Sequence, residues 1–292
     1  MIKKLYYKLI PSSRKKSMAT RFTRSTFGNI CCFVLIAAAG LFSMLPLIYA
    51  VVTSFKPIDE LLIFPPTFFV RRPTTENYVA LPTLLSSYVF NSLFITVFTS
   101  ILNIVFSAMA AFSLSKGTYK GRGIIFMIIQ FALMFNAYTL SVPQYVIFSE
   151  LHIVNTYWVY ILPQLAGTLG VFLIKQYIEG YVPDALLEAA KIDGAGYLRI
   201  FWRIIMPIIK PAWLTVTLFA FRDIWASIPN GTIFDEKLKT LPQIVTQVTA
   251  GGTARTGSAM ALTTIMMIPP IIIYLISQSN VVEAMSSAGI KE

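Results

Sequence analysis

The sequence predicts an all-α integral membrane protein with six transmembrane helices and a cytoplasmic helix-turn-helix segment between the fourth and the fifth. Three observations support this fold class. The chain of 292 residues is 56% hydrophobic and 13% charged, and its mean hydropathy of +0.69 exceeds that of soluble domains. It contains six long apolar runs, each close to or above the roughly 20 residues that cross a hydrocarbon core of about 30 Å. Its basic residues are also distributed unevenly between the loops that join these runs.

The six apolar runs cover residues 27–55, 84–114, 123–148, 154–174, 204–228 and 258–282. The first is about twice as long as the apolar core of a secretory signal peptide, so we interpret it as an uncleaved anchor. Only the fifth holds charged residues; besides Lys210 near its start these are Arg222 and Asp223. Because the spans and their loops use the whole chain, we expect a basic segment, 1–26, followed by one membrane domain, 27–292.

Basic residues indicate the orientation of the spans, since cytoplasmic loops carry an excess of lysine and arginine. Eight basic residues and no acidic one precede the first span. With six spans, 17 of the 24 basic residues fall on the same side as this segment. We therefore expect both termini in the cytoplasm. The net charge of +11 follows from this topology, and no nucleic-acid partner is expected.

The sequence lacks the residue groupings of enzyme and metal sites. Its single histidine, His152, has only Glu150 as a nearby ionisable residue, which makes neither a metal cluster nor a histidine-activated nucleophile. Cys31 and Cys32 are adjacent in the first span and predict no disulfide framework. The stretch 252–258 imitates a phosphate-binding loop but lacks the lysine that would reach the phosphates. We expect no catalytic residue, no metal site and no ATP hydrolysis in this chain.

A long connection between the fourth and fifth spans, residues 176–211, predicts two short helices at the membrane surface. Pro183 suits the first turn of a helix, Asp184 favours its positive end, and good helix formers follow to Lys191. Gly194 and Gly196 then break the helix. A second, amphipathic helix leads into the fifth span. Its apolar residues are Leu198, Phe201, Trp202 and Ile205. From physics alone, an interfacial connector with arginines near lipid phosphates explains this unit as well.

One long, fixed spacing lies within this segment. Its residues are Glu188-Ala189-Ala190, Gly194 after three residues, Ile204 after nine, and Met206-Pro207 after one more. This spacing resembles the Glu-Ala-Ala motif of permease subunits of binding-protein-dependent ATP-binding-cassette (ABC) importers. Residues typical of the carbohydrate, maltose-type branch are also present, namely Asp193-Gly194-Ala195, Phe201 and Pro211. Met206 stands where leucine is usual, a swap of similar volume.

The resemblance implies a transmembrane permease subunit in a bacterial cell membrane, which moves a carbohydrate such as an oligosaccharide or its derivative. The implied partners are a second, similar permease, two ATPase subunits and an external substrate-binding protein. ATP and magnesium would bind to the ATPase subunits, so this chain would hold no cofactor and would not be an enzyme. The motif region, 183–211, would dock on an ATPase subunit and transmit its closure to the spans. The implied docking residues are Glu188, Ala189, Ala190, Lys191, Asp193, Gly194, Ala195, Phe201 and Pro207.

Polar residues inside the spans are costly facing lipid, so they turn inward, where they bond neighbouring helices or line a path for a polar substrate. We expect a substrate pathway among Asn91, Asn136, Gln164, Arg222, Asp223 and Trp225. For any single residue, a bond between helices is the alternative. Arg222 and Asp223 are sequence neighbours and do not face each other on a helix, and both could instead lie near the outer interface. After Trp225 the family often has asparagine and an acidic residue, whereas this chain has Ala226 and Ser227.

Three alternative functions are open on the sequence. A permease for amino acids, peptides or ions shares the shorter motif but usually not Asp193-Gly194-Ala195 with Phe201. An ion-coupled secondary transporter or channel could use Arg222 and Asp223 and would need no ATPase. A membrane enzyme is the weakest alternative because catalytic groups are lacking.

Overall fold

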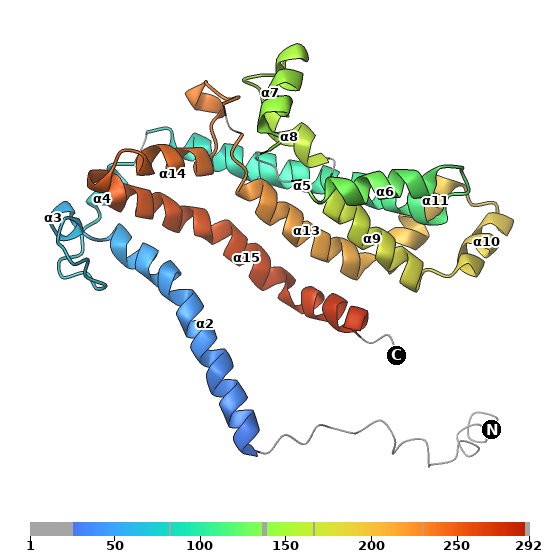
Figure 1. Ribbon diagram of the computed structural model, residues 1–292, viewed down its shortest axis with the longest axis horizontal. Coiled ribbons are helices and arrows are strands. Elements are labelled where there is room, and N and C mark those ends of the chain that lie inside the picture. The colour runs from blue at the N-terminus through green and yellow to red at the C-terminus, as the bar shows by residue number, and fades with distance from the viewer. Residues whose placement is uncertain (1–25, 82, 136–138, 166, 230, 290–292) are drawn as a thin grey trace. The chain divides into compact units, whose positions relative to one another are not determined.

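The computed structural model describes residues 26–81, 83–135, 139–165, 167–229 and 231–289, and every regular element in these ranges is a helix (Figure 1). The longer helices are α2 (Thr26–Ser54), α5 (Leu85–Lys116), α6 (Arg122–Ala132), α7 (Ser141–Glu150), α8 (Trp158–Leu165), α9 (Thr168–Tyr181), α10 (Asp184–Ile192), α13 (Lys210–Trp225), α14 (Leu241–Thr249) and α15 (Thr256–Gly289). The shorter elements are α3 (Ile58–Leu61), α4 (Glu76–Val79), α11 (Tyr197–Ile200), the π-helix η2 (Phe201–Ile205), α12 (Met206–Ile208), and the 3-10 helices η3 (Glu236–Leu238) and η4 (Thr253–Arg255). The all-α prediction is confirmed for the described residues.

Four helical stretches of the described residues are long and apolar enough to cross a membrane. They are Gly28–Ser54, Leu85–Lys116, Trp158–Tyr181 and Thr253–Gln278, and they overlap the runs predicted at 27–55, 84–114, 154–174 and 258–282. A fifth is obtained when Tyr197–Ile208 and Lys210–Trp225, which meet at a bend of 82°, are counted as one span. This bent pair overlaps the run predicted at 204–228. The chain therefore has the apolar helices of a multi-span membrane protein, and the count of six stays a prediction.

The run predicted at 123–148 is not one continuous helix. It contains α6 and α7, which are separated by turns at 133–135 and 139–140, and residues 136–138, including Asn136, lie outside the described residues. At 11 residues, α6 is too short to cross a bilayer by itself. Of the described turn residues, Leu133, Met134, Phe135 and Leu140 are apolar, so hydropathy does not distinguish them from the helices on either side.

The chain divides into two compact units, Met1–Tyr49 and Ala50–Glu292. Most of α2 belongs to the first unit, and Pro46 lies inside this helix without ending it. Large apolar side chains cover the helix on all sides and are exposed, Phe33 and Phe42 among them. A helix that is apolar all round is typical of a membrane span.

In the second unit, α5 is the central helix. It packs against α9, α13 and α8, while α15 packs against α13 and α14, and Figure 1 shows α5 along the length of this unit with α9 and α13 beside it. One end of the bundle, where α9 meets η2 and α12–α13, is held together by apolar residues, of which Ile174, Ile205 and Ile209 are fully buried.

Small and polar residues allow α5 and α9 to approach closely. Buried along α5 are Ser92, Thr96, Thr99, Ser100, Asn103 and Ser107. Opposite them, a side chain on Gly167 or Gly170 would collide with Asn103 or Ser107, respectively. Such pairing of small residues is how helices associate in lipid, where apolar surface alone gives no driving force.

The loop between α2 and α5 is ordered by buried charged groups. The Glu60 carboxylate is buried and accepts hydrogen bonds from the backbone N–H groups of Arg71 and Arg72, at 3.0 and 2.8 Å. Asn77 donates to the carbonyls of Ser54 and Lys56, at 2.9 and 2.8 Å. These contacts close the loop upon itself and fix it to the end of α2.

Candidate functional site

Three of the six predicted pathway residues meet in a cavity of about 560 Å³ between α7, α8 and the end of α13. Gln164 enters it from α8, and Arg222 and Asp223 enter it from the last turn of α13. The sequence placed these three residues in one pathway but gave no reason for neighbours such as Arg222 and Asp223 to share a cavity. They share it because α13 ends immediately after them, so the chain turns around this end of the helix.

A second cavity, of about 400 Å³, adjoins the first and extends along α9 and α13. The two have four lining residues in common, Gln144, Pro163, Gln164 and Asp223. The second cavity continues to Asn103 of α5 and to the backbone of Gly167 and Gly170. The two cavities together therefore extend from the end of α13 to Asn103 in the middle of α5.

The chemistry of these cavities suits a polyhydroxylated ligand. Arg222 offers guanidinium donors, Asp223 offers carboxylate acceptors, and the amides of Gln144 and Gln164 offer both. Among the described residues neither Arg222 nor Asp223 forms an ion pair within the chain. Apolar walls, such as Pro163, complete the lining. No described group of three or more metal-ligating side chains lies here or elsewhere.

Asn91 does not reach the cavity. Its side chain is buried, and its Nδ2 donates to the carbonyls of Lys237 and Lys239, at 2.7 and 3.0 Å. Its Oδ1 accepts a hydrogen bond from the Tyr157 hydroxyl at 3.0 Å. Asn91 therefore fits the alternative, a bond between helices. Its hydrogen bonds fasten the 237–239 stretch, which includes part of η3, to α5.

Trp225 is also committed to packing. Its Nε1 donates to the Met266 carbonyl of α15 at 3.0 Å, and its ring stacks on Phe221 with centroids 5.9 Å apart. Trp225 therefore joins α13 to α15 and fixes the helix end that carries Arg222 and Asp223. Asn136, the remaining predicted pathway residue, lies outside the described residues.

Other lining residues were not in the predicted set, among them Gln144 and Tyr160. Gln144 is a polar residue within an apolar run, the same signal that identified Gln164. Tyr160 gives no such signal, because tyrosine is common in membrane proteins. Its hydroxyl donates to Gln243 Oε1 of α14, at 2.6 Å, and so secures the cavity wall on α8.

The loop that closes the cavity beyond α13 is fastened by Asn155. This residue has a left-handed backbone with φ of 60°, and its Oδ1 accepts hydrogen bonds from the N–H groups of Phe234 and Asp235, at 3.0 and 2.9 Å. Its own N–H donates to the Thr232 carbonyl at 2.8 Å. Thr232 lines the cavity, so these bonds hold part of its wall in place.

The segment 183–211 forms α10, a turn and the α11–η2–α12 series. Pro183 is the N-cap of α10, and Gly194, with φ of 74°, makes the turn after it. The exposed members of the predicted docking set are Glu188, Ala189, Lys191, Asp193, Gly194 and Pro207. Ala195 is half-buried, while Ala190 and Phe201 are buried within the bundle. Most of the exposed members therefore lie on α10 and the turn after it, whereas Ala190 and Phe201 attach the segment to the spans.

Lys116 connects the start of α10 to the end of α5. Its Nζ donates to the Val182 carbonyl at 2.7 Å and to Asp184 Oδ1 at 2.6 Å. That hydrogen bond and the charge of Lys116 hold the pKa of the Asp184 carboxyl below its usual range. A second connection is made by Phe201, whose ring centroid lies 6.1 Å from that of Phe112 on α5.

No protein-family model matches the chain. It is 32% identical over 254 residues to the "Probable ABC transporter permease protein YurM" of Bacillus subtilis, with 84% of this chain and 83% of the relative covered. It is 30% identical over 253 residues to the "Probable starch degradation products transport system permease protein AmyC" of Thermoanaerobacterium thermosulfurigenes, with 85% and 91% covered. It is also 27% identical to the "Arabinooligosaccharides transport system permease protein AraQ" of Bacillus subtilis, over 88% of this chain and 95% of the relative.

The fold is also similar to that of a solved structure. A chain of a bacterial ABC transporter involved in the import of the acidic polysaccharide alginate superposes with a TM-score of 0.72 and 23% sequence identity. The likeness covers 88% of this chain and 98% of that one.

Proposed function

The chain belongs to the ABC transporter permease family, and we propose that it is the transmembrane permease subunit of a bacterial importer for an oligosaccharide or a related carbohydrate. The observation that carries the substrate class is the shared cavity of Gln144, Gln164, Arg222 and Asp223. Hydrogen-bonding side chains of both signs beside apolar walls suit sugar hydroxyls and ring faces. The names of relatives that transport starch degradation products and arabinooligosaccharides support the same class.

We further propose the assembly that such an importer needs. This chain would pair with a second, similar permease, two ATPase subunits and an external binding protein, with ATP and magnesium on the ATPase subunits. The proposed topology has six spans and both termini in the cytoplasm of a bacterial cell. In it, α6 and α7, with the residues between them, act as one broken span. Non-helical backbone at membrane depth is tolerated where it lines a cavity, and α7 lines one.

The proposed coupling runs from α10 to the cavity through contacts of the described residues. The exposed face at Glu188 docks on an ATPase subunit, and ATP-driven closure of the ATPase pair moves α10. Lys116 and Phe201 pass this movement to α5, and the chain from η2 through α12 passes it to α13, which carries Arg222 and Asp223. The membrane helices are then a two-state element that ligands bias at both ends.

The first experiment tests coupling with Glu188→Lys in the assembled complex. We expect the binding protein to stimulate ATP hydrolysis by the wild type, and the variant to lose this stimulation roughly tenfold or more. Reversing one charge of a buried interfacial pair costs about 2 kcal/mol or more. Glu150→Lys is the matched control, since Glu150 is exposed at the end of α7, far along the chain from α10. Equal effects of the two changes would contradict the docking role.

The second experiment tests the cavity by uptake of a radiolabelled oligosaccharide into cells or proteoliposomes. Arg222→Met and Asp223→Asn each remove one side chain that would hydrogen-bond the sugar. We expect the KM for uptake to rise about tenfold while binding-protein docking is unchanged. Arg255→Met, at an exposed position of η4, is the control. Should the chain purify alone and exchange solute in liposomes without an ATPase, the secondary-transporter alternative would replace the importer.

A further inference from the structure

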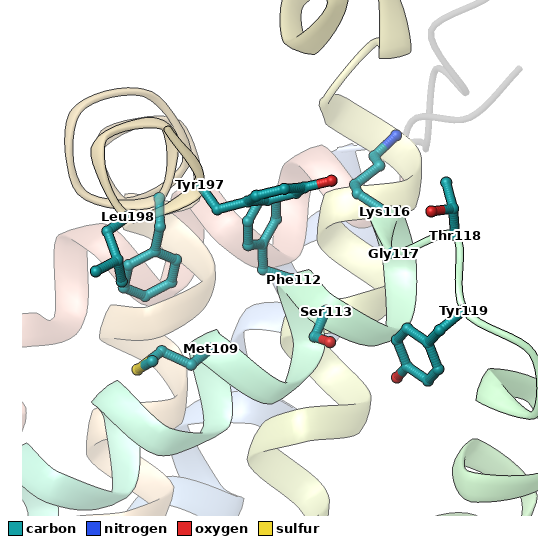
Figure 2. Close-up of a pocket in the computed structure, with 10 residues that line it drawn as sticks. Met109, Phe112, Ser113, Lys116, Gly117, Thr118, Tyr119, Tyr197 and Leu198 are labelled. Carbon is teal, nitrogen blue, oxygen red and sulfur yellow. The ribbon is translucent and has the colours of Figure 1, made fainter. Parts of the chain in front are cut away.

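A third cavity, of about 410 Å³, lies at the other end of α5 from Asn91, where α5 ends and α11 begins. Figure 2 shows Met109, Phe112 and Ser113 on α5, Tyr197 and Leu198 across from them, and Thr118 and Tyr119 on the loop that follows α5. The cavity shares no lining residue with the two cavities described above. The proposed function assigns it no role.

The inside of this cavity is apolar and its rim is polar. Met109, Phe112, Leu198 and Phe201 supply hydrocarbon and ring surface, whereas Thr118 and the tyrosines supply hydroxyls. Tyr197 and Leu198 remain 61% and 66% exposed although they are large and partly apolar. Exposed apolar side chains around a cavity of this kind mark a surface that is covered by something other than water.

In the proposed topology the cavity lies at the level of the membrane surface. The apolar run 84–114 ends two residues before Lys116, which is the last residue of α5 and lines the cavity. Tyr119, Tyr197 and the half-exposed Trp202 gather at this level, and tyrosine and tryptophan are the residues that concentrate at membrane–water interfaces.

Basic residues outnumber acidic ones close to the cavity. Lys116 is the charged residue of the lining, and it is paired with Asp184 of α10. Arg122 lies beside the lining, because its Nη1 donates to the carbonyl of the lining residue Gly117 at 2.6 Å. The flanking stretches 116–122 and 197–203 contain three further basic residues and no acidic residue, namely Lys120, Arg199 and Arg203.

We propose that this cavity binds one anionic phospholipid, with acyl-chain carbons against Phe112 and Leu198 and the phosphate beside the basic residues of 116–122. Its assignment to the cytoplasmic leaflet rests on the proposed topology. Each basic residue near an anionic headgroup contributes on the order of 1 kcal/mol, so an anionic lipid binds more tightly than a zwitterionic one. The lipid fills the space between α5 and α11 and thereby supports the joint that connects α10 to the spans.

The test is lipid binding to the purified full-length chain, measured by native mass spectrometry with phosphatidylglycerol and with phosphatidylcholine. We expect one phosphatidylglycerol to remain bound at detergent concentrations that remove phosphatidylcholine. Thr118→Asp adds a negative charge at the rim and weakens phosphatidylglycerol binding about fivefold, with phosphatidylcholine binding unchanged. Thr253→Asp, at an exposed threonine of η4, is its control and leaves both unchanged.

A second variant blocks the cavity itself. Ser113→Phe places a ring in the space for the acyl chain and abolishes retention of the lipid, whereas Ser149→Phe, at an exposed serine of α7, does not. Equal binding of the two lipids, equal effects of a variant and its control, or retention by Ser113→Phe would overturn the proposal. If Ser113→Phe does not fold, the comparison of Thr118→Asp with Thr253→Asp decides alone. No ATPase takes part, so a negative result leaves the importer proposal standing.

Discussion

Replacing Gly170 by alanine should destabilise the packing of α9 against α5 and α13. A Cβ atom at this position would lie 2.9 Å from Ser107 Oγ, 3.2 Å from Ser107 Cβ and 3.0 Å from Val216 Cγ1. Ser107 and Val216 are 1% and 3% exposed, so neither has free space into which to move. Forcing an extra carbon into such packing costs about 1–3 kcal/mol, and better helix propensity returns about 0.5–1 kcal/mol. We expect a net loss of about 1–2 kcal/mol.

The assay is thermal unfolding of the purified chain in one detergent, followed by circular dichroism. Gly123→Ala is the matched control, because Gly123 lies in α6 and a Cβ there would have no neighbour within 4 Å. It should leave the unfolding temperature unchanged or raise it. Adding Ser107→Gly to Gly170→Ala should restore part of the loss, since it removes one of the two obstructing side chains.

Refutation would come from a Gly170→Ala chain that unfolds at the wild-type temperature or above it, as the Gly123 control does. In that case α5, α9 and α13 would not be in the close contact described, and the second cavity along α9 would have different walls. A loss of stability that Ser107→Gly does not reduce would instead place the obstruction at Val216.

Three further predictions concern the loops and α10. Glu60→Ala leaves two partly buried backbone N–H groups without an acceptor, a loss of about 1–3 kcal/mol that should speed tryptic cleavage after Arg71; cleavage at the wild-type rate would contradict this. In Asn155→Ala the alanine must adopt φ of 60°, at a cost of about 1–2 kcal/mol, whereas the glycine of Asn155→Gly tolerates that backbone. The amide hydrogens of the loop before α14 should therefore exchange faster in Asn155→Ala than in Asn155→Gly. Asp184 has a lowered pKa because Lys116 donates a hydrogen bond to it and adds its charge. Stability from this contact is complete above the unfolded-state pKa of about 4 and is lost only as pH falls through the lower folded-state value. Asp184→Asn should therefore loosen α10 at pH 7, whereas moving the wild type from pH 8 to pH 5 should not, as hydrogen exchange of α10 would show.

The long apolar helices could be predicted closely because hydropathy measures the length of an apolar run. The run 258–282 lies within α15, and the run 84–114 lies within α5 except for its first residue, the N-cap Leu84. Hydropathy does not detect a break in a helix within an apolar run. The prediction therefore combined α6 and α7 into one span, and it did not anticipate the bend of 82° before α13. Pro207 and Pro211 lie in first turns on each side of that bend, where proline is compatible with helix, so their presence alone does not fix an angle.

The candidate site was predictable in part, for a related reason. Polar residues in apolar runs identify groups that must turn away from lipid, and Gln164, Arg222 and Asp223 do share a cavity. Composition cannot say whether such a group meets a cavity or a backbone carbonyl from a distant part of the chain. Asn91 meets the carbonyls of Lys237 and Lys239, almost 150 positions away, and only the tertiary fold brings these together.

The bend before α13 makes the preceding helical arm a lever. The arm Tyr197–Ile208 lies at 82° to Lys210–Trp225, and its 12 residues have a length of about 18 Å. A rotation of about 10° around Ile209 would carry the outer end of the arm through about 3 Å, at helical rise. Because the arm and α13 are nearly perpendicular, a force on the arm along the axis of α13 would tilt α13. The last turn of α13 carries Arg222 and Asp223. In the proposed coupling, the fully buried Ile209 would be the pivot, and small movements at the membrane surface would change the angle of the cavity wall.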